Sequence, residues 1–265
     1  MSDPRSEVAL RRILVAIEPP TLTEQPAVAA ARELARSLRL ELVGLFVESL
    51  DLLRLAALPI AREVGAASGA VRSIELTDVE RSLRVQAEQV RGILSSLAAE
   101  LDLPWSFRVE RGDLLERVLA ELSETAAAVF APAPRKAHIT PHGAAGATPP
   151  RRILTILDST PAGMRAANAA QRLSLTSGAA LSVAIVSKEE TPLGPLAEKV
   201  AKSLPGLRGD TKCLRLADTS IDTLSEVARD TACDLLVLST NAFPSERRAF
   251  RALLRRVRCP VAVVG

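Results

Sequence analysis

The chain has 265 residues, which fits two domains of ordinary size better than one small domain. Its composition is globular, with 48% hydrophobic and 25% charged residues, but only 2% are aromatic. Because so few rings are available to stack on bases, we expect no single-strand nucleic-acid binding. The net charge of +3 arises from interleaved basic and acidic residues, so the sequence has no polyanion-binding signature and no nucleic-acid partner is expected.

Charge and cysteine patterns favour a soluble, cytoplasmic protein. The segment Met1–Arg12 has no apolar stretch after its charges, as a secretion signal would, and no run of about 18 uncharged apolar residues predicts a membrane span. The cysteines Cys213, Cys233 and Cys259 are odd in number and lack C-x-x-C spacing. Each lies beside an apolar run, where a reduced thiol packs as a small hydrophobic group.

Two segments of the chain repeat one pattern. Arg11–Glu18 and Arg151–Asp158 each contain two arginines, an apolar run and a final carboxylate. Short runs rich in branched residues and followed by Pro or Ser/Thr predict strands that are buried on both faces and end in a turn. The repeat therefore predicts a duplicated unit.

The elements after these strands also correspond. In the first half we predict a helix at 27–38, a strand at 42–47, an irregular segment at 50–77 with a short helix at 52–60 and a loop at 65–69, a helix at 79–101, and strands at 105–109 and 129–131. In the second half we predict helices at 166–175, 196–204 and 245–257 and strands at 181–186, 212–216, 234–239 and 261–264. Asp113 and Asp218 are each expected to start a further helix, where an N-terminal cap stabilises by about 1 kcal/mol.

Alternation of strands and helices predicts an α/β fold with right-handed crossovers and a parallel sheet covered on both faces. We predict two tandem open-sheet, Rossmann-like domains, at residues 1–135 and 151–265, joined by a Pro/Gly/Ala linker at 136–150. The segment Pro132–Pro150 contains five prolines and resists regular structure. The first domain is therefore expected to be truncated, without the last helix and strand of the second.

The chain resembles the universal stress protein (UspA-like) family. The resemblance rests on the element order, on the carboxylate after the first strand, and on the runs Ala232–Ser239 and Arg258–Val264, the latter reading Arg-Cys-Pro-Val-Ala-Val-Val. It implies a stress-response protein with five-stranded sheets of the adenine nucleotide alpha hydrolase-like type, and a tandem pair that mimics the dimer of the family.

Many members of that family bind ATP through a G-x-x-G-x9-G-S/T loop, whose backbone N–H groups cradle the phosphates. The corresponding segment here, Ser239–Glu246, contains no glycine, so side chains are expected where the phosphates would lie. Glu246 would also repel a triphosphate. Gly143 and Gly146 form a G-x-x-G pair, but the next strand follows too soon, and a flexible linker explains them.

The candidate nucleotide-binding residues lie at the ends of predicted strands. A carboxylate at the carboxyl end of a central strand occupies the crevice where α/β sheets bind ligands. The resemblance implies that Asp158 and Ser159 would hold adenosine and that Val186 would line the adenine pocket; Ser239 and Thr240, at the start of the loop without glycine, complete the set. Alternatively, Asp158 forms an Asx-turn or caps the next helix, and Val186 is ordinary core.

No residue pattern predicts catalysis. His138 and His142 have the i, i+4 spacing of a metal pair, but Pro141 between them indicates a solvated linker, so no metal site is expected. Without another histidine there is no Ser–His or Cys–His pair, and no G-x-S-x-G motif occurs. We expect no enzyme and no cofactor, apart from ATP or AMP in the Asp158 crevice. Glu18, the first-half counterpart of Asp158, is followed by two prolines and has a less defined role.

Three surfaces are candidates for partner contacts. The last helix and the residues after it carry six arginines, which form either a solvated face or a site for phosphate or an acidic partner: Arg247, Arg248, Arg251, Arg255, Arg256 and Arg258. The Leu-rich stretch 52–60 either covers the core of its own domain or docks a protein partner, whose identity is unknown. The strand 261–264 is predicted to be an edge strand, through which two chains would pair as a homodimer. The resemblance implies an alternative, in which a tandem chain closes internally.

Two functions remain. We favour a non-catalytic stress-family protein that acts through protein–protein contacts and does not bind ATP through a Gly-rich loop. The alternative is an adenine-nucleotide sensor or weak ATPase that uses the Asp158 crevice.

Overall fold

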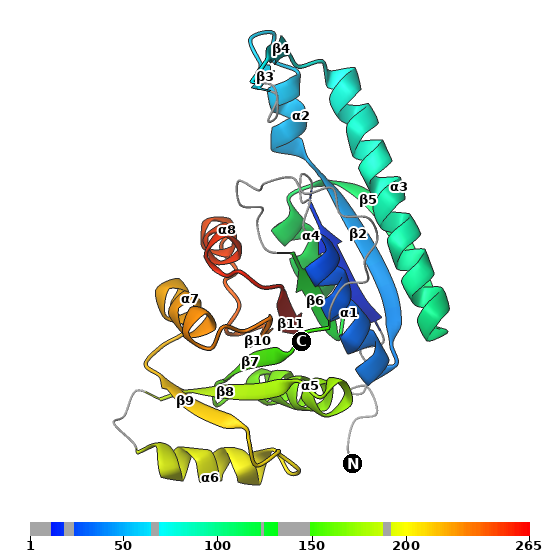
Figure 1. The fold of residues 1–265 in the computed structure, drawn as a ribbon. Helices are drawn as coiled ribbons and strands as arrows, with labels where there is room; N and C mark the ends of the chain where they lie inside the picture. Colours follow the sequence, from blue (N-terminus) through cyan, green and yellow to red (C-terminus); the bar gives the residue numbers. More distant parts are fainter. Residues whose placement is uncertain (1–11, 19–23, 65–68, 123–124, 132–148, 188–191) are drawn as a thin grey trace, which may run out of the picture.

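The computed structural model describes residues 12–18, 24–64, 69–122, 125–131, 149–187 and 192–265. The first half contains β1 (Arg12–Ile17), α1 (Glu24–Leu38), β2 (Glu41–Ser49), α2 (Leu50–Ala56), β3 (Arg62–Val64), β4 (Val71–Ser73), α3 (Leu76–Leu101), β5 (Trp105–Gly112), α4 (Leu114–Glu121) and β6 (Ala127–Phe130). The second contains β7 (Arg152–Leu157), α5 (Pro161–Ser177), β8 (Ala180–Val186), α6 (Leu193–Ser203), β9 (Lys212–Leu216), α7 (Ile221–Asp230), β10 (Leu235–Ser239), α8 (Arg247–Arg256) and β11 (Val261–Val264) (Figure 1). The predicted α/β class is confirmed.

The two halves share a single sheet. Its nine strands follow the order β5-β2-β1-β6-β11-β10-β7-β8-β9. Pairing is parallel within each half and antiparallel only between β6 and β11, where Ala128 lies opposite Val263. The prediction of two separate open sheets is therefore refined: β11 joins them into one.

The prediction that β11 is an edge strand is wrong. It pairs with β10 on one side and with β6 on the other. The described residues between β6 and β7 contain no helix or strand, so β6 has an open edge that β11 covers. Because β11 has no free edge, two chains cannot pair through it into the predicted homodimer. Residues 132–148, with most of the predicted linker, lie outside the described residues, and the domain boundaries stay a prediction.

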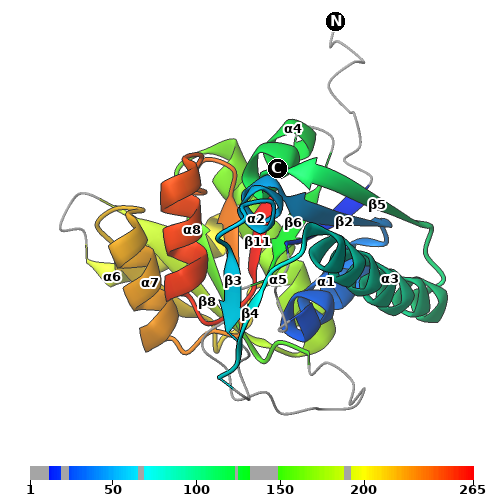
Figure 2. The same ribbon diagram turned by 90° about the horizontal axis from the view of Figure 1, so that it is seen from above.

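Helices cover both faces of the sheet (Figure 2). Successive side chains of a strand point to opposite faces, so Ile13, Val15 and Ile17 pack toward α1, α3 and α5. Leu14 and Ala16 pack with the side chains of α4, α7 and α8. All five side chains are buried, which explains why this strand is a continuous apolar run without alternation.

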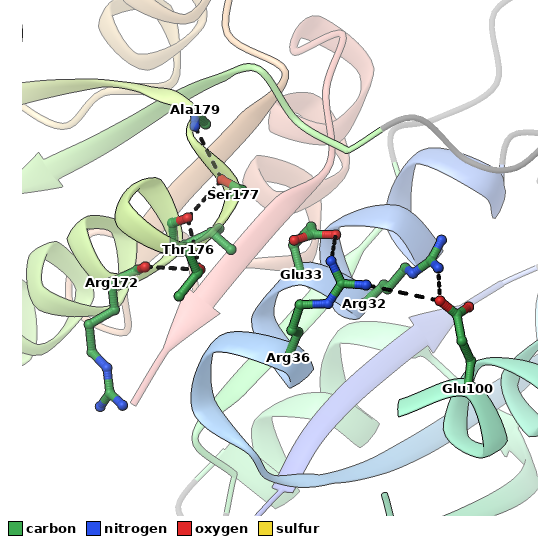
Figure 3. A network of polar contacts seen from close by, with 9 residues as sticks. Arg32, Glu33, Arg36, Glu100, Arg172, Thr176, Ser177 and Ala179 are labelled. Carbon is green, nitrogen blue, oxygen red and sulfur yellow. Dashed lines mark hydrogen bonds and ion pairs between the residues drawn. The ribbon is translucent and has the colours of Figure 1, made fainter. Parts of the chain in front are cut away.

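Surface ion pairs connect α1 to α3 on one face of the sheet (Figure 3). Arg32 forms an ion pair with Glu100, and Arg36 Nη2 lies 3.9 Å from the same carboxylate. In the nearby end of α5, the hydroxyl group of Ser177 donates to the carbonyl of Leu173 at 2.7 Å. Because exposed ion pairs contribute roughly 0–1 kcal/mol each, the two pairs between α1 and α3 add little to stability.

A projecting arm, formed by residues 50–64 and 69–76, extends beyond the sheet (Figure 1). It contains the short helix α2, which the sequence predicts, and the antiparallel hairpin β3–β4, which it does not; the segment was expected to be irregular. On α2, Leu53 and Ala56 are buried, whereas Leu55 is exposed. The Leu-rich stretch thus covers core with one face and presents apolar side chains with the other.

Candidate functional site

A cavity of about 440 Å³ opens at the carboxyl ends of β7 and β8. It is lined by Leu157, Asp158, Ser159, Thr160, Pro161, Met164, Ile185, Val186, Ser187, Val200 and Ser203. The structure therefore brings together Asp158, Ser159 and Val186, as predicted. Thr160, Met164 and Ser203 were missed. Thr160 had a signal, because a Thr two residues after an Asp commonly closes a turn at a helix start.

Asp158 has a structural role in the turn before α5. Its Oδ1 accepts hydrogen bonds from the Thr160 backbone N–H at 3.0 Å and from the Thr160 hydroxyl group. These hydrogen bonds form an Asx-turn, the structural role that the sequence allows for Asp158 beside ligand binding. Thr160 is itself the N-cap, since its Oγ1 accepts from the Gly163 N–H at 3.0 Å. A side chain at position 163 would overlap the Asp158 carboxylate, so glycine permits this close approach.

Ser239 lies behind Asp158 rather than in the cavity. Its hydroxyl group donates to Asp158 Oδ2 at 3.1 Å and accepts from the Ala242 N–H at 3.1 Å, and its side chain is fully buried. The N–H of Thr240 donates to the carbonyl of Val264 at 3.2 Å. Neither Ser239 nor Thr240 is among the described residues that line the cavity. A carboxylate has about four acceptor positions, so Asp158 can still accept a hydrogen bond from a ligand.

Side chains fill the segment that corresponds to the phosphate loop. Ala242 and Phe243 are buried, and the Phe243 ring packs against Phe130 and Phe250, each with centroids 5.4 Å away. We call Phe130, Phe243 and Phe250 the aromatic cluster. The segment has no glycine, and three of its N–H groups are already engaged: that of Thr240 donates to the Val264 carbonyl, and those of Ala242 and Phe243 donate to the Ser239 carbonyl.

In the first half, Glu18 stands where Asp158 stands in the second half, and arginines of α8 cover this position. Arg251 Nη2 lies 3.5 Å from Glu18 Oε1 and 3.7 Å from Asp113 Oδ2, and Arg247 Nε lies 2.6 Å from Asp113 Oδ2. Arg247 also pairs with Asp51. Burial raises the pKa of Glu18 above its ordinary value, against the opposing effects of Arg251 and of a hydrogen bond from Ser49. Two of the six arginines thus bind carboxylates of the first half and are not a free basic face.

The two aspartates predicted to start helices behave differently. Asp113 is the N-cap of α4, accepting from the N–H groups of Leu115 at 3.0 Å and Glu116 at 3.3 Å. For α7 the N-cap is Ser220, so that prediction for Asp218 is wrong. Asp218 instead accepts from the Ser220 N–H at 2.9 Å, a bond that lowers the pKa of its carboxyl group.

The described residues contain no group of three or more His, Cys, Asp or Glu side chains suited to a metal ion. His138 and His142 lie outside the described residues. No helix in the described ranges is both long and apolar enough to cross a membrane.

The sequence matches no family model and no curated protein, but solved structures resemble the fold. A universal stress protein from Archaeoglobus fulgidus is 11% identical, with a TM-score of 0.55 over 96% of this chain and 96% of that chain. A protein of unknown function from Pseudomonas aeruginosa is 16% identical, with a TM-score of 0.45 over 97% and 92%. A universal stress protein in complex with cAMP is 20% identical, with a TM-score of 0.36 over 44% and 97%. The match to the Archaeoglobus fulgidus structure shows that the chain has the fold of a universal stress protein.

Proposed function

We propose that the chain is a cytoplasmic universal stress protein that acts without catalysis, through contacts with a protein partner. The observation that carries the proposal is the projecting arm (Figure 1). Its exposed apolar side chains include Ile60 at 83% exposure, Val64 at 66% and Val71 at 58%, together with Leu55 and Leu58. Seven of the twelve exposed large hydrophobic residues in the described part of the chain lie on this arm. A local group of exposed apolar side chains is typical of a protein interaction site.

The loop after β10, which is filled by its own side chains, supports the proposal that the protein does not bind ATP through this loop. Binding a triphosphate would require Phe243 to leave the aromatic cluster and its backbone to reorganise. Burying a phenylalanine contributes about 1.5–3 kcal/mol, so that reorganisation opposes binding. In the first half, Glu18 and Asp113 place negative charge at the corresponding crevice, where an anionic nucleotide would also compete with them for Arg247 and Arg251.

Replacing Ile60 with glutamate is expected to reduce partner capture. The tagged protein is cross-linked in a lysate of its native host, and captured proteins are quantified by mass spectrometry. Because central apolar contacts in an interface often contribute more than 1 kcal/mol, we expect loss of about tenfold or more of the captured partner. Leu175→Glu is the matched control, since Leu175 is exposed on α5, away from the arm. Equal capture by both variants would contradict the proposal.

The second candidate function is adenine-nucleotide sensing in the Asp158 crevice, and the 440 Å³ cavity favours it. Titration calorimetry with ATP, AMP and cyclic AMP separates the two candidates. We expect no micromolar binding of any of the three. Micromolar binding that is lost in Asp158→Ala and retained in Asp218→Ala would establish the sensor instead. Asp218 is the control because it closes a similar turn outside the cavity.

A further inference from the structure

Two of the three cysteines are in direct contact. Cys233 lies two residues before β10 and Cys259 two residues before β11, and their sulfur atoms lie 3.4 Å apart. They are held there by the sheet, because β10 and β11 are parallel neighbours and Leu236 N–H donates to the Pro260 carbonyl at 3.0 Å. The third thiol, Cys213, lies on β9, outside this pair. Cys233 and Cys259 are free thiols buried in the hydrophobic core, as the sequence predicts, but the sequence did not indicate that they touch.

The contact is close to the geometry of a disulfide. A disulfide has an S–S length of about 2.05 Å, so the two sulfurs need to approach by only about 1.4 Å. Both cysteines precede strands of the same sheet, and rotation of two side chains can supply such a movement without moving the strands. The fold has thus placed two thiols, 26 residues apart in sequence, at bonding reach.

A cavity leads to this pair. It has a volume of about 730 Å³ and is lined by Cys233, Cys259, their neighbours Asp234, Arg258 and Pro260, residues 149–152, and Pro26, Ala29 and Ala30 of α1. Cys233 is 9% exposed and Cys259 is 3% exposed. Because so little of each thiol is exposed, a small oxidant can reach the sulfur atoms more readily than a bulky peptide disulfide can. The Asp234 carboxylate, which lines the same cavity, forms an ion pair with Arg152, with Oδ1 3.4 Å from Nη2, so these two charges offset each other near the thiols.

The two thiols are not equivalent. The hydrogen bond with Cys259 lowers the pKa of Cys233 below its ordinary value, against the effect of burial. The pKa of Cys259 is raised well above its ordinary value by the same hydrogen bond and by burial. Cys233 is also the more exposed of the two, at 9% against 3% for Cys259, so an oxidant reaches it first. Cys233 is therefore assigned as the nucleophile of the pair and Cys259 as the resolving thiol.

We propose that Cys233 and Cys259 form a peroxide-reactive dithiol site that closes to an intramolecular disulfide. The Cys233 thiolate attacks one oxygen of hydrogen peroxide, the O–O bond breaks, and the hydroxide that leaves takes up a proton to become water. Cys233 is then a sulfenic acid. The sulfur of Cys259, losing its proton, attacks the Cys233 sulfur, and the sulfenic hydroxyl group leaves with that proton as a second water. The dithiol loses two electrons and the peroxide gains them.

Peroxide titration of the Cys213→Ser protein tests the site. The reduced protein receives one equivalent of hydrogen peroxide without air, and free thiols are then counted after denaturation. We expect the count to fall from two per chain to none, the intact mass to fall by two hydrogen atoms, and peptide mapping to give a Cys233–Cys259 cross-link within one chain. Dithiothreitol should restore both thiols. Two thiols that persist, or a cross-link between chains, would overturn the proposal.

Two further variants assign the roles of the thiols. In Cys213→Ser/Cys259→Ser, a dimedone probe should trap a sulfenic acid on Cys233, because no resolving thiol remains. In Cys213→Ser/Cys233→Ser, the remaining Cys259 should react severalfold more slowly than Cys233 does in the first variant, because Cys259 is the more deeply buried thiol, 3% exposed against 9%. Far-UV circular dichroism of each variant confirms that it is folded. Equal peroxide reactivity of the two single-thiol proteins would contradict the assignment.

Discussion

Replacing Val263 with proline is expected to lower the free energy of unfolding by about 1–3 kcal/mol for the buried ladder acceptor that loses its donor, and by more because the ring does not fit. Val263 is fully buried in β11 and lies between Leu238 of β10 and Ala128 of β6. Proline has no N–H group for the ladder, and its ring does not fit an interior strand. Because β11 has a neighbour on each side, the substitution disturbs the connection between the two halves as well as the second half itself.

Urea unfolding followed by two probes measures this effect. Trp105, the single tryptophan, lies in β5 at the far edge of the first half, whereas far-UV circular dichroism reports on the whole chain. If the sheet unfolds as one unit, the two transitions of the natural protein coincide. In Val263→Pro both should move to lower urea. Val71→Pro is the control, since β4 pairs only with β3 in the exposed hairpin. A transition midpoint of Val263→Pro equal to that of this control would contradict the shared-sheet description.

The central strands could be predicted because burial on both faces leaves a recognisable pattern in their sequences. A strand buried on both faces is a short run of branched apolar residues, and the central strand β11 has the predicted bounds. The neighbour of β11 could not be predicted, because pairing between β11 and β6 depends on which edges remain open after each half folds. The hairpin β3–β4 was missed for another reason. Its strands have three residues each and are largely exposed, so they show no apolar alternation.

The candidate site was partly predictable for a similar reason. Asp158 follows a recognisable strand, so its place at the crevice follows from topology. Its partners do not, since the choice between ligand contact and Asx-turn depends on the positions of Thr160 and Ser239. The contact of Arg247 with Asp51 joins residues 196 apart in sequence. No local pattern indicates such a pair, nor the sulfur contact between Cys233 and Cys259.

Replacing Phe250 with alanine is expected to lower the free energy of unfolding by about 3–5 kcal/mol, the range for a large buried aromatic side chain. Phe250 lies on α8 and is 2% exposed. The centroid of its ring lies 5.1 Å from that of Phe130 and 5.4 Å from that of Phe243. Phe130 belongs to the first half, and Phe243 to the loop after β10. The cavity left by the substitution would therefore loosen both the contact between the halves and that loop.

Urea unfolding and hydrogen exchange separate these two consequences. Phe250→Leu is the control, because an aliphatic side chain still fills most of the space and such swaps usually cost less than about 1.5 kcal/mol. In Phe250→Ala, Trp105 fluorescence and circular dichroism should shift together, and the Ala242 and Phe243 amides should exchange faster under native conditions. If the amides stay protected while stability falls, the aromatic cluster stabilises the sheet but does not hold the loop closed, and the explanation given for the missing phosphate site fails.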